Sequence, residues 1–128
     1  MNVLVVMQPS EERTALAGQL AELGIEPLVA GEPREAIAVL QRTDDVTAVL
    51  SGWALAQGSG LDLLRTLRAD SRWEELPVVM VTGADELGQV TQALDAGASE
   101  YLMKPCDAQA LLEKLLILGV DPERRAAA

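Results

Sequence analysis

Short, mostly apolar runs alternate along the chain with segments whose apolar residues are spaced three or four positions apart. The runs lie at positions 3–7, 28–30, 46–51, 77–82 and 100–103. Continuous apolar runs of this length are typical of strands that are covered on both faces in a parallel sheet. The segments between them predict helices, because their apolar residues fall on one helical face. These sets are Leu16, Leu20 and Leu23; Ala36, Ile37 and Leu40; Leu61, Leu64 and Leu67; Leu87, Val90 and Leu94; and Leu111, Leu115 and Leu118.

The regular alternation predicts an α/β fold. Strands and helices that alternate with short links require a parallel sheet with helices on both faces and right-handed crossovers. A chain of 128 residues is the size of one domain. We predict a domain over residues 1–119 and a flexible tail or linker start over residues 120–128, which are charged and then alanine-only at their end. Ligands of such sheets bind at the carboxyl ends of the strands.

Composition and charge exclude several functional classes. The formal net charge of −10 disfavours nucleic acid and membrane surfaces as partners. The chain has no histidine, so Ser/His/Asp and Cys/His nucleophile pairs and imidazole metal sites are excluded. Cys106 has no second cysteine with which to form an internal disulfide, and the apolar runs are too short for a membrane span. We therefore expect a cytoplasmic protein that is not an enzyme and needs no cofactor.

Residues at the strand ends resemble those of response-regulator receiver domains, the flavodoxin-like phosphoacceptor modules of two-component signalling. The resemblance covers residues 2–119 and rests on Thr82 at the end of the fourth strand, on residues 95–98, on Tyr101 and on Lys104-Pro105 after the fifth strand. It implies a (βα)5 doubly wound sandwich whose five-stranded parallel sheet carries helices on both faces. It also implies that Thr82 and Lys104 contact a phosphoryl group and that the rotamer of Tyr101 couples to it.

Three positions depart from the family pattern. Receivers that are phosphorylated carry an acidic pair after the first strand, which holds Mg²⁺, and a phosphoacceptor aspartate after the third. Here these positions are Met7, Gln8 and Gly52. Phosphoryl transfer needs a nucleophilic oxygen and a divalent cation held by oxygen ligands. We therefore expect no Mg²⁺ binding, and an alternative acceptor such as Ser51 or Ser59 would have no general base.

Two functions follow from this departure. The first is a non-phosphorylatable pseudo-receiver that acts as a protein–protein interaction and regulatory module in bacterial two-component signal transduction. The alternative is a small-anion or small-ligand sensor that uses the vacated pocket around Lys104 and Thr82, because Lys104 has lost its acidic partners there and a free cation can hold an anion. Beside this pocket, Met7 is expected to fill the volume left by Gly52, and Trp53 is expected to be half exposed.

The last helix has more apolar residues than one sheet-facing stripe needs. Leu112 and Leu116 lie outside that stripe, and surplus apolar surface indicates a partner. In receivers, the face formed by the fourth helix, fifth strand and fifth helix is where dimers and effectors dock, and Leu87 and Val90 belong to that fourth helix. We expect a protein partner or a homodimer through this face. In the alternative, Leu112 and Leu116 only pack against the neighbouring helix or the tail.

Overall fold

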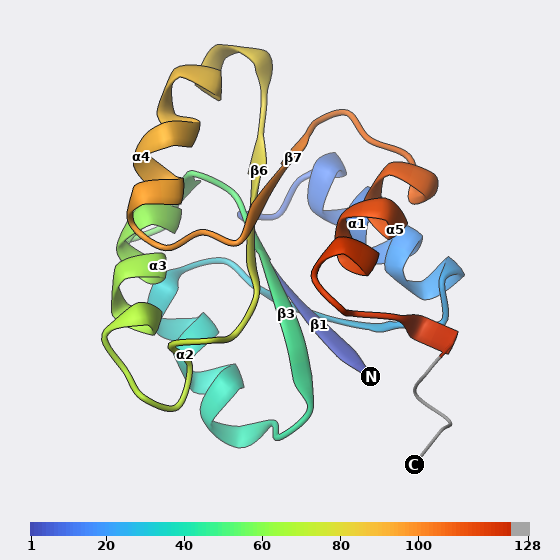
Figure 1. Cartoon of the computed structure of the whole chain (residues 1–128), viewed down its shortest axis with the longest axis horizontal. Coiled ribbons are helices and arrows are strands. Elements are labelled where there is room, and N and C mark those ends of the chain that lie inside the picture. Colours follow the sequence, from blue (N-terminus) through green and yellow to red (C-terminus); the bar gives the residue numbers. More distant parts are fainter. Residues whose placement is uncertain (124–128) are drawn as a thin grey trace.

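The predicted alternation is present in the computed structural model, which describes residues 1–123 (Figure 1). The strands are β1 (Asn2–Val6), β2 (Glu26–Ala30), β3 (Val46–Ser51), β4 (Ala54–Leu55), β5 (Gly58–Ser59), β6 (Val78–Thr82) and β7 (Glu100–Met103). The α-helices are α1 (Glu11–Glu22), α2 (Pro33–Arg42), α3 (Gly60–Arg68), α4 (Val90–Asp95) and α5 (Ala108–Ile117), and a 3₁₀ helix, η1 (Ala84–Gln89), precedes α4.

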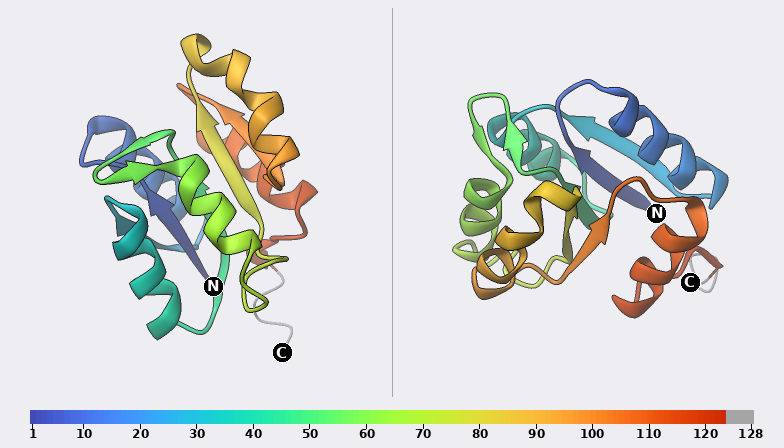
Figure 2. Two further views of the ribbon diagram at one scale, coloured as in Figure 1. Left: turned by 90° about the vertical axis from the view of Figure 1, so that its left-hand side faces the viewer. Right: turned by 90° about the horizontal axis from the view of Figure 1, so that it is seen from above.

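The main sheet has the order β2-β1-β3-β6-β7, and all neighbouring strands in it are parallel. This is the flavodoxin-like, doubly wound order, so the predicted fold class is confirmed. Helices α1 and α5 cover one face of the sheet, and α2, α3 and α4 cover the other (Figure 2). The carboxyl ends of β1, β3, β6 and β7 therefore meet at one edge of the sheet.

Strand β1 is apolar from Val3 to Val6 because both of its faces are buried. Leu4 and Val6 of β1 pack in a cluster with α2 and α3, whereas Val3 and Val5 pack with α1 and α5. All four side chains have no exposed surface. Successive strand residues point to opposite faces, and each fully buried aliphatic side chain contributes about 1.5–3 kcal/mol. The absence of a polar position in residues 3–6 is thus a consequence of the central place of β1 in the sheet.

Two segments differ from the prediction. The helix expected from the spacing of Leu87, Val90 and Leu94 is a 3₁₀ helix over its first half, in which no residue is buried. An α-helical turn is stabilised mainly by packing of an apolar face, and that packing begins at Ala93 of α4, which is 1% exposed. In the second segment, the loop after β3 contains a short antiparallel hairpin of β4 and β5.

Two residues after the predicted boundary at residue 119 are buried, Val120 and Pro122. Gly119 has a positive φ of 81°, which turns the chain back after α5. Val120 then donates its backbone N–H to the Leu115 carbonyl oxygen at 2.9 Å and is 4% exposed. Pro122 is also buried. Val120 and Pro122 thus pack against the domain, and residues 124–128 of the predicted tail lie outside the described residues.

Gly60 holds the loop after β3 against the end of the sheet. Its N–H donates to the Trp53 carbonyl oxygen at 2.8 Å. A Cβ atom at this position would lie 2.0 Å from the Gly52 carbonyl oxygen and 2.8 Å from Ser51 Oγ. The close approach of these two backbone segments therefore requires glycine, and it sets the position of Gly52 relative to α3.

We expect Gly60→Ala to lower the free energy of unfolding by about 2 kcal/mol or more, because the backbone of the loop must move to relieve the overlap. Gly18→Ala is the matched control: Gly18 lies in the middle of α1, where an added Cβ atom would have no neighbouring atom within 4 Å, and we expect a gain of about 0.5–1 kcal/mol. Urea unfolding of both variants measures the difference. Equal stability of the two variants would contradict the packing role of Gly60.

Candidate functional site

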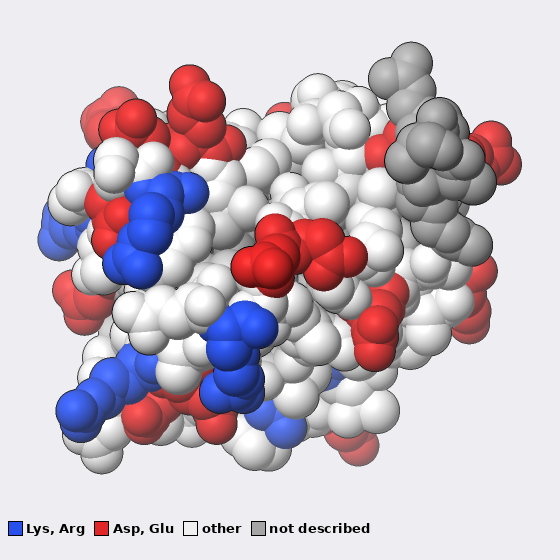
Figure 3. Space-filling model, turned by 90° about the horizontal axis from the view of Figure 1, so that it is seen from below, with Lys and Arg blue, Asp and Glu red and all other residues white. Residues whose placement is uncertain are grey.

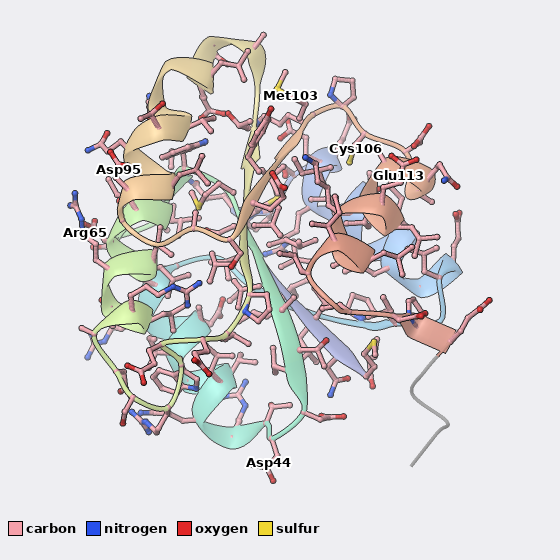
Figure 4. All side chains as sticks on the ribbon, viewed as in Figure 1. Asp44, Arg65, Asp95, Met103, Cys106 and Glu113 are labelled. Carbon is pink, nitrogen blue, oxygen red and sulfur yellow. The ribbon has the colours of Figure 1, made fainter. Side chains whose placement is uncertain are left out.

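The strand ends surround a depression of about 150 Å³. Met7 and Gln8 reach it from the end of β1, residues 52–54 from the end of β3, and Lys104 from the end of β7. The start of α1 adds Ser10 and Glu12, and η1 adds Glu86. Met103 and Cys106, labelled in Figure 4, mark the segment after β7 that carries Lys104. We keep the name vacated pocket for this depression.

The positions of the missing carboxylates are held by Met7, Gln8 and Gly52. Met7 is 6% exposed and belongs to the core cluster beneath α1 and α5. A Cβ atom on Gly52 would lie 3.5 Å from Met7 Cγ, so the Met7 side chain packs where a side chain at position 52 would begin. Gln8 is exposed, and its amide donates to the Ala54 carbonyl oxygen at 3.4 Å. These three residues provide packing and one weak hydrogen bond, but no carboxylate.

Lys104 is not free, which corrects the expectation of an unpartnered cation. Its Nζ lies 2.9 Å from Glu12 Oε2 and 3.9 Å from Glu86 Oε1. The hydrogen bond to Glu12 raises the pKa of Lys104 above its ordinary value. Glu86 Oε1 also accepts the Gly83 N–H at 2.9 Å. The sequence did not identify Glu12 and Glu86 as partners of Lys104. Acidic residues in the first turn of a helix are also favoured by the helix dipole, so their presence there does not indicate a contact with a lysine.

Thr82 is fully buried at the end of β6 and does not line the vacated pocket. Its hydroxyl donates to the Gly83 carbonyl oxygen at 3.3 Å, and its own carbonyl oxygen accepts the Lys104 N–H at 2.9 Å. The peptide bond between Lys104 and Pro105 is cis. Of the two residues predicted to frame the pocket, Lys104 therefore lines it and Thr82 does not.

Tyr101 is partly exposed on β7, where a cation covers its ring. Lys114 Nζ of α5 lies 4.7 Å from the centroid of the Tyr101 ring and 3.2 Å from Glu100 Oε1. A lysine over an aromatic face is attracted by the ring quadrupole. The contact joins β7 to α5 on the open edge of the sheet.

Trp53 and the two serines near the pocket are placed by the loop after β3. Trp53 is 8% exposed, so the expectation that it is half exposed was wrong. Its ring packs in the cluster beneath α2 and α3, to which Leu55 of the hairpin also belongs. Ser51 is fully buried and donates to the Gly52 carbonyl oxygen at 2.9 Å. The Ser59 hydroxyl accepts the Asp62 N–H at 3.1 Å and caps α3.

The four residues expected at a docking face lie on two different sides of the molecule. Leu112 and Leu116 line a groove together with Leu23 at the end of α1. Leu87 lies on η1, and Val90 begins α4, on the opposite face of the sheet from α5. Each of η1, α4, β7 and α5 carries one exposed apolar side chain apart from this groove: Leu87, Leu94, Met103 and Ile117.

A hollow of about 440 Å³ lies far from the strand ends that form the vacated pocket. It is lined by residues of segments 40–46 and 71–76, near the amino ends of β3 and β6.

At this end of the molecule, the guanidinium group of Arg72 lies over the Trp73 ring, 4.1 Å from the ring centroid. The hydrogen bonds that Arg72 donates to the Asp70 carboxylate lower the pKa of Asp70 to about 2. Figure 3 shows this end of the molecule, with most Lys and Arg side chains on the side of α2 and α3.

A comparison with protein families agrees with this geometry. The family model for the response regulator receiver domain matches residues 3–116. The chain belongs to this family. Chemotaxis protein CheY1 of Helicobacter pylori is 35% identical to this receiver over 123 residues, which are 94% of this chain and 99% of that protein.

Solved structures show the same fold. A response regulator receiver protein from Pseudomonas putida superposes with a TM-score of 0.76 at 31% identity, covering 92% of this receiver and 93% of that chain. The chemotaxis response regulator CheY4 of Vibrio cholerae superposes with a TM-score of 0.80 at 24% identity, covering 91% and 97%. The second likeness concerns the fold alone.

The residues of the vacated pocket do not fit the Mg²⁺ ion that the receiver family implies. Mg²⁺ requires several oxygen ligands in near-octahedral geometry. The two carboxylates present, Glu12 and Glu86, both face the ammonium group of Lys104. Among residues 1–123, no three His, Cys, Asp or Glu side chains are grouped so that they could hold a metal ion. Within the same residues, no helix has the length and apolar character needed to cross a membrane.

We expect Glu12→Gln to lower the free energy of unfolding by about 0.2–1 kcal/mol, because the ion pair with Lys104 is partly exposed. The raised pKa of Lys104 means that this stabilisation is fully present below the unfolded lysine pKa of about 10.4 and is lost as the pH rises through the higher folded pKa. Urea unfolding at pH values on both sides of about 10.5 measures the effect.

Glu11→Gln is the control, because Glu11 occupies the same first turn of α1. Both substitutions remove one favourable charge from the helix N-terminus, so the difference between them isolates the contact with Lys104. A Glu12→Gln effect that equals the Glu11→Gln effect, or that persists at high pH, would contradict the ion pair.

Proposed function

We propose that this receiver is a pseudo-receiver: it is not phosphorylated, and it acts as a protein–protein interaction and regulatory module in bacterial two-component or chemotaxis signalling. The observation that carries the proposal is the absence of a carboxylate at Met7, Gln8 and Gly52, the positions where phosphorylated receivers bind Mg²⁺ and accept the phosphoryl group. Its curated relatives include chemotaxis proteins. We propose the cytoplasm as its location.

The chemistry of phosphoryl transfer supports this proposal. The reaction spreads charge over the equatorial oxygens of the transferred group, and a metal ion and a positioned nucleophile are required to accelerate it. Position 52 offers only a hydrogen atom, with Met7 Cγ packed beside it. Ser51 is buried and Ser59 caps a helix, so neither hydroxyl is a substitute acceptor at the pocket.

The geometry does not favour the alternative of an anion sensor. An anion that entered the vacated pocket would meet Glu12 and Glu86 as well as Lys104. Like charges at such short range oppose binding, and the positive charge of Lys104 is already paired at 2.9 Å. The cation that would attract an anion in this pocket is therefore neutralised by residues that sequence reasoning did not include.

A protein partner is favoured by the open side of η1, α4, β7 and α5. On these elements Leu87 and Leu94 are 45% exposed each and Ile117 is 68% exposed. Exposed apolar residues that gather on one side of a small domain indicate an interaction surface. We propose that Leu87 and Val90 belong to this docking surface. On α5, we propose Ile117 as its residue instead of the expected Leu112 and Leu116.

Incubation with Mg²⁺ and a small phosphodonor tests the proposal. We expect intact-protein mass spectrometry to show no added phosphoryl group on the wild-type chain. The matched variant combines Met7→Asp, Gln8→Asp and Gly52→Asp, which restores the three carboxylates; a Cβ at position 52 meets Met7 Cγ at an ordinary 3.5 Å. We expect this variant to acquire one phosphoryl group. A phosphorylated wild-type chain would overturn the pseudo-receiver proposal.

Inorganic phosphate separates the two candidate functions. We expect no change of the Gly83 and Lys104 amide NMR signals when phosphate or sulfate alone is added, because Lys104 is paired with Glu12. The control is Glu12→Gln combined with Glu86→Gln, which leaves Lys104 as the unpaired charge of the pocket and should respond. Saturable shifts in the wild-type chain that Lys104→Ala removes would support the anion sensor instead.

A further inference from the structure

The five-stranded sheet has two open edges, one along β2 and one along β7. Within residues 1–123, each of these strands is hydrogen-bonded to one neighbouring strand, whereas the three strands between them have two neighbours. An open edge presents backbone N–H and C=O groups that pair readily with a strand of another chain. The edges of β2 and β7 are therefore the places where a second molecule could extend this sheet.

Each open edge carries one exposed apolar side chain. Among residues 1–123, two of the exposed large apolar residues lie on strands: Val29 of β2, which is 44% exposed, and Met103 of β7, which is 37% exposed. An exposed apolar edge strand favours edge-to-edge association of a sheet with its own copies. Whether a strand adds at these two edges therefore depends on the backbone groups beside Val29 and Met103.

On β2, the outward position before Val29 is a proline. The Glu26 N–H donates to the carbonyl oxygen of residue 1 at 3.0 Å, and the Ala30 carbonyl oxygen accepts the N–H of residue 7 at 2.9 Å, so both residues bond to β1. Backbone groups alternate along a parallel strand, and Pro27 and Val29 therefore face the open edge. Proline has no backbone N–H. Val29 is thus the one residue of β2 with an N–H directed to this edge.

On β7, a carboxylate occupies the outward N–H before Met103. The Lys104 N–H, directly after β7, donates to the Thr82 carbonyl oxygen at 2.9 Å, so by the same alternation Tyr101 and Met103 face the open edge. Glu100 Oε1 accepts the Tyr101 N–H at 3.0 Å. The N–H of Tyr101 is therefore bonded within the chain and is not offered to an added strand.

The Glu100 carboxylate is held in this position from α5. Lys114 Nζ lies 3.2 Å from the same Oε1 atom that accepts the Tyr101 N–H, and it also lies 4.7 Å from the centroid of the Tyr101 ring. A hydrogen bond to an ionised acceptor is roughly twice as strong as one between neutral groups. An added strand, which offers only a neutral carbonyl oxygen, would have to displace this carboxylate.

We propose that Pro27 and Glu100 block the two open edges of the sheet against strand addition by a second copy of this chain. A ladder needs donors and acceptors on successive outward residues, and each block removes one of the two outward N–H groups of its strand. The inference goes beyond the proposed function, because it assigns a role to two residues outside the vacated pocket and holds whether or not the chain is phosphorylated.

Pro27→Val tests the block on β2, because valine restores the N–H and is favoured in strands. We expect amide hydrogen exchange of Val29 to slow about tenfold from dilute to concentrated samples of this variant, and its sedimentation coefficient to rise. Pro9→Val is the matched control, because Pro9 is exposed in the loop between β1 and α1. A Val29 amide that is equally protected in the wild type, or that does not respond in Pro27→Val, would overturn the role of Pro27.

Glu100→Ala tests the block on β7, because it frees the Tyr101 N–H. We expect the amides of Tyr101 and Met103 to become protected from exchange as the concentration of this variant rises. Lys114→Met is the matched control: it removes the ion pair but leaves the Glu100 carboxylate as the acceptor of the N–H, and it should behave like the wild type. Concentration-dependent protection in Lys114→Met that equals that in Glu100→Ala would overturn the role of Glu100 as the acceptor.

The combined variant distinguishes edge pairing from a loss of stability. An unblocked β2 pairs with β2 of a second copy about a twofold axis and gives a closed dimer, whereas two unblocked edges also let β2 of one copy add to β7 of the next, a head-to-tail contact that does not close. We expect dimers of Pro27→Val and larger assemblies of Pro27→Val with Glu100→Ala, at temperatures where thermal unfolding shows each variant to be folded. Adding Val29→Lys to Pro27→Val should restore the wild-type behaviour, because a charged edge residue opposes pairing. Assembly that begins only when the variants unfold would overturn the proposal.

Discussion

Burial of the central sheet on both faces is the constraint on which the rest of this receiver depends. The side chains of residues 3–6 in β1 and 48–50 in β3 have no exposed surface. With no water at these strands, every backbone N–H and C=O must be paired within the ladder, so the strands lie in register and their carboxyl ends reach the same edge. The vacated pocket exists at that edge because parallel strands end together, whatever side chains follow them.

Electrostatic balance then decides what the pocket can do. A lysine at the end of β7 that had lost its carboxylate partners would be a poorly compensated charge beside a packed core, which is unfavourable. Glu12 of α1 and Glu86 of η1 compensate it, and Met7 fills the apolar volume beside Gly52. Lys104, which in the family contacts the phosphoryl group, thus has structural partners here.

The elements that the sequence did not predict share one physical origin. The 3₁₀ form of η1, the burial of Trp53 and the packing of Val120 each depend on contacts between segments that are distant in the sequence or on the lack of such contacts. Trp53, for example, follows a strand end and adjoins a loop, which suggests exposure. The hairpin of β4 and β5 instead turns the loop back, Gly60 donates its N–H to the Trp53 carbonyl oxygen, and the ring joins the buried cluster that contains Leu55.

The fold class, the strand ends that form the site and the lack of carboxylates at Met7, Gln8 and Gly52 can be read from the sequence, because apolar periodicity and side-chain chemistry are local properties. Only the tertiary structure decided which charges meet and which apolar residues share a surface. Glu12 and Lys104 are 92 positions apart, and they pair because α1 begins beside the end of β7. Leu112 and Lys114 are two positions apart in the sequence, yet the helical rotation between them places one toward α1 and the other over Tyr101.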